Sequence, residues 1–265
     1  MREGTSEAKD RMVPDLKSLS RGVWSGNLTN NQELPVGGSL FNDELSIKLR
    51  LDFDQFSGQT EKFTAGNIRA LYEQNKQPII DWLQELGSDV DPYLFYVAQQ
   101  VQQKMQILLE ASPQQPDKPL ERQQKYAEDR VPALSELKGM TRCAERAAMG
   151  QYLLQRAGLE SAYVGGITMN DAKNGEEWPE DHSYIVVKNP SNHEETFIFD
   201  IARPHSQQNL ARVLKSAVPI TYELLQGKKE LLVKAADVLQ GGELYFGVGA
   251  PVAGQHGFIE AARAE

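Results

Sequence analysis

Apolar and polar residues alternate in a short segment near residue 50. Within 44–53, every second residue is apolar: Leu45, Ile47, Leu49, Leu51 and Phe53. Successive side chains of a strand point to opposite faces, so a period of two predicts a β-strand with one buried face. Residues 1 to about 40 show little periodicity and contain several glycines and the polar tract 27–31. We interpret residues 1–43 as an irregular N-terminal extension.

Between about residues 65 and 110 the apolar spacing changes to that of helices. The first helical pattern is carried by Ile68, Leu71, Tyr72, Ile79, Trp82, Leu83 and Leu86. The run 87–92, which reads Gly-Ser-Asp-Val-Asp-Pro, interrupts it. A second helix is predicted to begin at Pro92, with Asp91 as its N-cap. The Pro-rich segment 112–119 is interpreted as a loop within one domain, because a further helical pattern follows it.

The segment 139–204 predicts one helix followed by three strands. Small and apolar side chains share one face of the helix: Cys143, Ala147, Gly150, Leu154 and Ala157. Thr141 is the expected N-cap and Gly158 the expected end, which places Cys143 in the first turn. The strands are predicted over 161–169, 182–187 and 196–201, with a polar loop over 170–181. His182 is expected to open the second strand, and Asp200 to lie late in the third.

Composition and charge narrow the classes of function. The chain has 265 residues, of which 40% are hydrophobic, enough for a sizeable core, and its formal net charge is -9. This acidic balance argues against nucleic acid or an anionic membrane as a partner. No apolar run approaches the ~18 residues of a membrane span, and the polar start is unlike a signal peptide. We therefore expect a cytoplasmic protein, or one exported without a cleavable N-terminal signal peptide.

The chain contains a single cysteine, Cys143. One cysteine excludes an internal disulfide and any zinc site built from several thiolates. The remaining histidines form no metal-ligand spacing, and the glycine-rich segments lack the spacing of a phosphate-binding loop. We expect no metal and no cofactor. Taken by itself, a lone cysteine is more often a small buried hydrophobe than a reactive group.

The order of three residues gives Cys143 a second interpretation. A cysteine at a helix start is followed by His182 and then by Asp200, on adjacent predicted strands. A thiol enzyme needs a thiolate, an imidazole to pair with it and an acceptor that fixes the imidazole tautomer. The helix N-terminus favours the thiolate, because its free N–H groups carry partial positive charge. The order therefore predicts a catalytic set of Cys143, His182 and Asp200.

About 65 residues around this set resemble the core of the transglutaminase-like, papain-related superfamily. The resemblance rests on the segments 158–162 (GLESA), 164–166 (VGG), 182–186 (HSYIV) and 200–204 (DIARP). It departs from the family pattern in Ala144, where an aromatic residue is common, and in Tyr184, where Trp is frequent. The resemblance implies that Cys143 is the nucleophile, His182 the base and Asp200 the residue that orients it. It also implies an α+β fold, in which a nucleophile helix packs on an antiparallel sheet.

This resemblance implies one catalytic domain over 44–265, with a helical N-terminal part. The implied reaction is thiol-dependent acyl transfer at amides, with protease, glutamine deamidase and transglutaminase outcomes all open. One alternative is an enzyme similar to arylamine N-acetyltransferases; another is an inactive module of the same fold that binds a partner. We expect a protein or peptide substrate, because no cofactor motif is present. The acidic residues of 170–181 favour a basic partner surface. The oligomeric state is left open.

Overall fold

The computed structural model describes residues 24–36, 47–111, 118–127, 130–171, 177–193, 195–202, 214–216 and 244–246. In these residues the protein combines helices with antiparallel sheets, so the expected α+β class is confirmed at that level. The larger sheet has the order β1-β4-β5-β6-β7, with β8 also paired to β4. Its strands are β1 (Trp24–Gly26), β4 (Ser161–Asp171), β5 (Glu177–Lys188), β6 (Thr196–Phe199), β7 (Leu214–Ser216) and β8 (Leu244–Phe246). A second sheet pairs β2 (Glu33–Pro35) with β3 (Lys48–Arg50).

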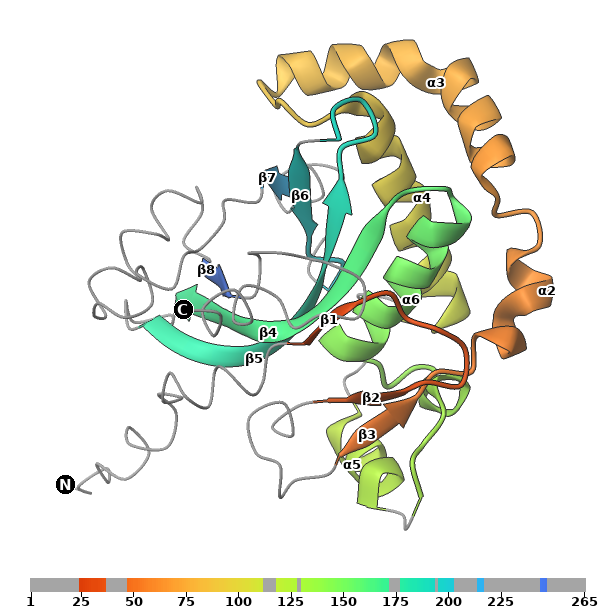
Figure 1. Ribbon diagram of the computed structural model, residues 1–265, viewed down its shortest axis with the longest axis vertical. Helices are drawn as coiled ribbons and strands as arrows, with labels where there is room; N and C mark the ends of the chain where they lie inside the picture. The colour runs from red at the N-terminus through yellow and green to blue at the C-terminus, as the bar shows by residue number, and fades with distance from the viewer. Residues whose placement is uncertain are drawn as a thin grey trace, which may run out of the picture.

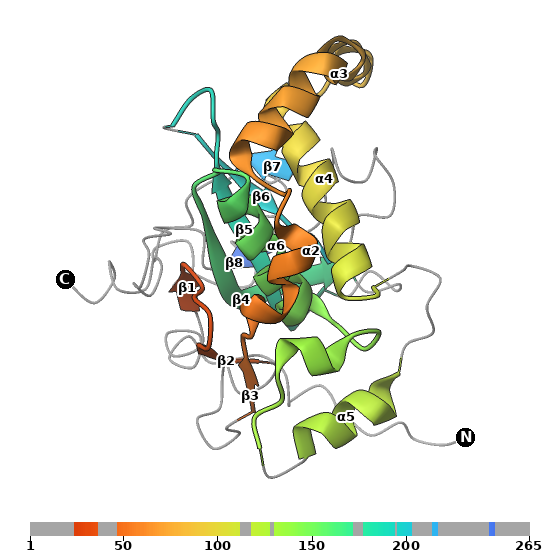
Figure 2. The same ribbon diagram turned by 90° about the vertical axis from the view of Figure 1, so that its right-hand side faces the viewer.

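Three helices stack in successive layers beside the larger sheet, and the innermost of them contacts its strands (Figures 1 and 2). Helix α6 (Cys143–Arg156) lies against β4 and β5, α4 (Pro92–Leu108) against α6, and α3 (Ala65–Glu85) against α4. The remaining helical elements are η3 (Phe53–Phe56), α2 (Ser57–Thr60), α5 (Pro119–Ala127) and η4 (Leu134–Leu137). One core cluster joins these layers, from Leu34 and Leu49 through Leu94 and Val97 to Ile185.

Helices α3 and α4 form where the sequence predicts them. Helix α4 begins at Pro92, and the carboxylate of Asp91 accepts a hydrogen bond of 2.8 Å from the Leu94 backbone N–H. Proline lacks a backbone N–H, and its fixed φ suits the first helical position, so the start signal is local. Pro92 and Asp91 therefore act as expected.

Helix α6 ends as predicted. It begins at Cys143, one residue later than an N-cap at Thr141 would place its start. Gly158 follows the helix with φ +79°, a left-handed conformation that glycine adopts without strain. The N-cap position is Arg142 rather than Thr141. The Glu145 carboxylate accepts a 2.9 Å hydrogen bond from the Arg142 N–H, so the side chain three residues into the turn replaces the expected cap. Cys143 is thus the first residue of the helix.

Two sequence-based expectations in the N-terminal half need correction. The strand predicted over 44–53 is shorter in the described residues, because β3 covers Lys48–Arg50 and η3 begins at Phe53. The stretch interpreted as irregular contains two strands, β1 and β2, with the side chains of Leu28, Leu34 and Val36 buried. Three-residue strands carry too few alternations to be seen in the sequence, and they form here because β4 and β3 supply hydrogen-bonding edges.

The hairpin of β4 and β5 is longer than predicted. The two strands pair from Ser161 opposite Val187 to Asp171 opposite Glu177. Most of the expected polar loop over 170–181 is therefore strand, except residues 172–176, which lie outside the described residues. His182 lies in the middle of β5 rather than at its start. Backbone pairing extended the hairpin past the apolar residues that mark a strand in the sequence.

Within the described part of the chain, no helix combines the length and apolar character needed to cross a membrane.

Candidate active site

Cys143 stands at the N-terminus of α6, where the first backbone N–H groups have no partner within the helix. Its side chain is partly exposed. The residues that follow it, Ala144, Ala147 and Ala148, are buried and small, which brings α6 close to its neighbours. Gly150 shows how close: a Cβ there would lie 2.7 Å from the Cδ1 atoms of both Ile185 and Ile201. Tight packing of α6 on the sheet fixes the position of the thiol.

His182 and Asp200 meet in the interior. The Nε2 atom of His182 is 2.8 Å from Oδ2 of Asp200, and the two side chains are 6% and 0% exposed. Asp200 directly follows β6, whose register places Phe199 opposite Ile185. Continuing that register puts Asp200 beside Tyr184, which shares a face of β5 with His182. The second oxygen, Oδ1, accepts a 3.2 Å hydrogen bond from the Ala202 N–H, which holds the carboxylate in place.

The surroundings of His182 favour its protonated form. Burial lowers the pKa of an imidazole, but here the charge of Asp200 and its hydrogen bond act in the opposite direction. The nearby Cys143 acts in the same direction as Asp200. The net result raises the pKa of His182 to about 10. Since Asp200 occupies Nε2, the ring nitrogen left for the thiol is Nδ1.

A buried polar cluster holds the start of α6, and the sequence did not indicate it. The Glu145 side chain is fully buried, and its Oε1 atom is 2.7 Å from Nη1 of Arg122 and 2.6 Å from the hydroxyl of Tyr126. Arg122 also donates to the Met140 carbonyl at 3.3 Å. Burial and the neighbouring Glu145 carboxylate raise the pKa of Tyr126. These contacts tie α5 to the turn that carries Cys143.

Glu145 is fully buried, although a charged residue in the first turn of a helix is usually solvated. Its position three residues after the N-cap is a known capping signal, and this was the one usable indication of its role. Arg122 and Tyr126 lie about 20 residues earlier in a polar helix, and nothing in their spacing points to a buried partner. The acidic residues of 170–181, which the sequence suggested would favour a basic partner surface, lie where the structure describes no side chains.

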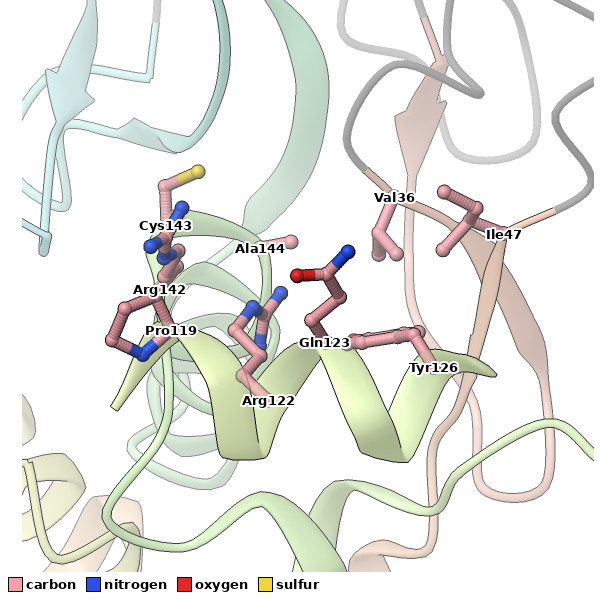
Figure 3. A pocket seen from close by; sticks show the side chains of 9 residues that line it. All are labelled: Val36, Ile47, Pro119, Arg122, Gln123, Tyr126, Arg142, Cys143 and Ala144. Atoms are coloured by element: carbon pink, nitrogen blue, oxygen red, sulfur yellow. The ribbon is translucent and has the colours of Figure 1, made fainter. Parts of the chain in front are cut away.

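A pocket of about 380 Å³ opens beside Cys143. Figure 3 shows α5 along one side of it, the start of α6 next to α5, and the β2 and β3 segments opposite. Its lining residues are Val36, Ile47, Pro119, Arg122, Gln123, Tyr126, Arg142, Cys143 and Ala144. The thiol is therefore both near His182 and accessible to a small group from solution.

The structure thus brings His182 against Asp200, and Cys143 is near enough to His182 to influence its electrostatics. The backbone N–H of Cys143 is among the N–H groups at the helix start that have no partner within the helix. Among the described residues, no group of three or more His, Cys, Asp or Glu side chains is arranged to hold a metal ion.

Comparisons with known proteins add no identification. No family model matches the sequence, and no curated protein or solved structure matches it either. The geometry of the site is therefore the basis for the proposed function.

Proposed function

We propose that the protein is a thiol enzyme that transfers acyl groups from amides, with Cys143 as nucleophile, His182 as acid and base, and Asp200 as the residue that orients His182. The observation that carries the proposal is a buried imidazole held by a carboxylate on Nε2 and interacting with a thiol at a helix N-terminus. The proposed fold is the papain and transglutaminase-like core. Its support is the order of nucleophile helix and antiparallel strands.

In the proposed reaction the Cys143 thiolate attacks the carbonyl carbon of an amide, and the carbonyl oxygen becomes an oxyanion facing the Cys143 N–H. When the C–N bond breaks, the His182 imidazolium gives its proton to the leaving nitrogen, and a thioester remains on Cys143. His182, now neutral, takes a proton from the incoming water or amine, which attacks the thioester. The acyl group leaves, and the proton on His182 restores the thiolate–imidazolium pair.

Asp200 supports both halves of this cycle. Its carboxylate raises the pKa of His182, which keeps the imidazolium next to the thiol at neutral pH. Its hydrogen bond to Nε2 also fixes the ring, so that Nδ1 stays directed to the sulfur. The substrate proposed is a protein or peptide, because the pocket opens to solvent beside an accessible thiol.

The acceptor decides the product, and mass spectrometry separates the outcomes. A peptide library rich in Gln and Lys is incubated with the wild type and with Cys143→Ala. A gain of ~1 Da at Gln indicates deamidation, a new link from Gln to Lys indicates cross-linking, and new termini indicate proteolysis. We expect one of these products with the wild type alone. The proposal fails if Cys143→Ala forms the same product at the same rate.

Loss of activity should be graded across the site. His182→Ala should reduce the rate nearly as much as Cys143→Ala, and Asp200→Ala should reduce it less, because orientation is one part of what the imidazole needs. Acetyl-CoA consumption with an arylamine, in place of any peptide product, would instead support the arylamine N-acetyltransferase alternative. A thiol that reacts no faster than a free cysteine, together with no product, would support an inactive binding module.

A further inference from the structure

Two arginines line the pocket beside Cys143, on a protein that is acidic overall. Two of its nine lining residues are arginines, Arg122 and Arg142, and none of the nine is acidic. The formal net charge of the whole chain is -9. A local positive site on an acidic protein attracts an anionic group there while the rest of the surface repels it.

The two arginines differ in what they do. Arg122 is mostly buried and forms the 2.7 Å ion pair with Glu145, so its charge is largely balanced inside the protein. Arg142 directly precedes the nucleophile and is exposed to solvent. Figure 3 shows its guanidinium next to Cys143, across the pocket from Val36 and Ile47. Arg142 is therefore placed to contact a group bound close to the thiol.

The shape and chemistry of the pocket fit a carboxylate on a short carbon chain. A guanidinium offers two parallel N–H donors that match the two oxygens of a carboxylate. The apolar residues Val36, Ile47 and Ala144 line the same space and suit methylene groups. A volume of about 380 Å³ is enough for one amino-acid side chain, and the thiol in its lining would place that side chain close to the carbonyl carbon that Cys143 attacks.

We propose that this pocket is a specificity site for acidic acyl groups, in which Arg142 binds a carboxylate that lies a few atoms from the carbonyl carbon attacked by Cys143. Substrates with Asp, Glu or a free carboxylate at the acyl residue are then preferred over neutral and basic ones. This inference rests on the proposed function for its meaning in catalysis. The charge preference of the pocket itself is a property of the folded protein and is tested without any substrate.

Alkylation of Cys143 measures that preference directly, because the chain contains no other cysteine. Iodoacetate and iodoacetamide attack the same sulfur and differ chiefly in charge, so the ratio of their rates reports on an anion beside the thiol. We expect the ratio to be roughly threefold to tenfold higher in the wild type than in Arg142→Gln, and to fall as salt is added. Intact-protein mass spectrometry follows both reactions.

Matched variants separate Arg142 from a general change in charge. Arg50→Gln removes an equal charge from an exposed arginine that does not line the pocket, and it should leave the ratio unchanged. Arg142→Lys keeps the charge without the two parallel donors, and it should retain most of the preference. Equal rate ratios in the wild type and Arg142→Gln would overturn the inference. So would a fall in the ratio for Arg50→Gln as large as the fall for Arg142→Gln.

Peptide substrates complete the test. If the enzyme cleaves backbone amides, substrates that differ only in Glu against Gln at the acyl residue should show a higher kcat/KM for Glu in the wild type. If it acts on a Gln side chain, the same comparison is made at the residue next to that Gln. In either case Arg142→Gln should lose most of the difference. If the alkylation ratio behaves as expected but no peptide is turned over, the charge preference of the pocket is supported and the proposed function is contradicted. If peptides are turned over with no preference for Glu and the alkylation ratio is flat, the proposed function stands and the acidic specificity fails.

Discussion

The buried pair of His182 and Asp200 should make stability depend on pH. The pKa of His182 is raised from 6.5 to about 10 in the folded protein. Its contribution to the free energy of unfolding is therefore complete below about pH 6.5 and is lost as the pH rises toward 10. Asp200→Asn removes the charge that causes the shift and should cost about 3 kcal/mol near pH 6, because the imidazole is left buried without a counter-ion.

Urea unfolding midpoints measured from pH 6 to pH 10 test this prediction. The difference in stability between the wild type and Asp200→Asn should be largest at pH 6 and should shrink with rising pH. His182→Gln lacks the titrating group and should also lack this part of the pH dependence. Parallel pH profiles for all three proteins would contradict the assignment of charge to His182.

Glu145 should matter to stability far more than an ordinary surface carboxylate. Its side chain is fully buried between Arg122 and Tyr126, so Glu145→Ala leaves a buried guanidinium and hydroxyl without their partner. We expect a loss of about 3 kcal/mol. Glu136→Ala is the matched control, because Glu136 pairs with Arg130 near the surface and should cost less than about 1 kcal/mol. Chemical denaturation measures both; similar losses would refute the structural role of the cluster.

At the scale of the elements, α6 is held by close packing at Gly150. A methyl group at this position would lie 2.7 Å from the side chains of Ile185 and Ile201, so Gly150→Ala must displace both. We expect a loss of about 1–3 kcal/mol. The helical Gly66 in α3 has open space around its Cα, so Gly66→Ala should instead stabilise the protein by up to about 1 kcal/mol. Thermal unfolding should show opposite signs; the same sign for both would contradict the close approach.

The helices could be predicted from sequence because their signals are local. Asp91 and Pro92 mark the start of α4, and Gly158 the end of α6, through groups only a few residues apart. The length of the β4–β5 hairpin could not be predicted, because pairing between backbones gives no side-chain pattern over its polar part. Strands β1 and β2 were also missed. The partner of β1 is β4, far along the chain, and the partner of β2 is the three-residue strand β3.

At the scale of the whole molecule, the segment before α2 belongs to the core of the described structure. Leu34 on β2 is fully buried, so Leu34→Ala should cost about 2–4 kcal/mol. Leu120→Ala is the matched control, because Leu120 is 72% exposed and its replacement should change stability by less than about 0.5 kcal/mol. Urea unfolding compares the two variants. Equal small effects would mean that β2 lies outside the cooperative unit.

The sequence indicated which residues could form the candidate site, but not what surrounds them. The order of helix and strands pointed to Cys143, His182 and Asp200, and Asp200 contacts His182 in the structure. The pocket and the buried Glu145 cluster depend on α5 and β2 meeting the start of α6, which are contacts between distant segments. Contacts between segments so far apart leave no pattern in any one stretch of sequence, so composition and spacing could not indicate the pocket or the Glu145 cluster.

The most direct test of the central claim is the rate at which iodoacetamide labels Cys143 between pH 6 and 7. Iodoacetamide reacts with the thiolate, and a His182 that stays protonated through neutral pH stabilises that thiolate. The wild type should react about tenfold or more faster than His182→Gln, whereas His193→Gln, which removes an exposed histidine, should react like the wild type. Equal rates in the wild type and His182→Gln would contradict a thiol activated by His182, and with it the proposed enzyme.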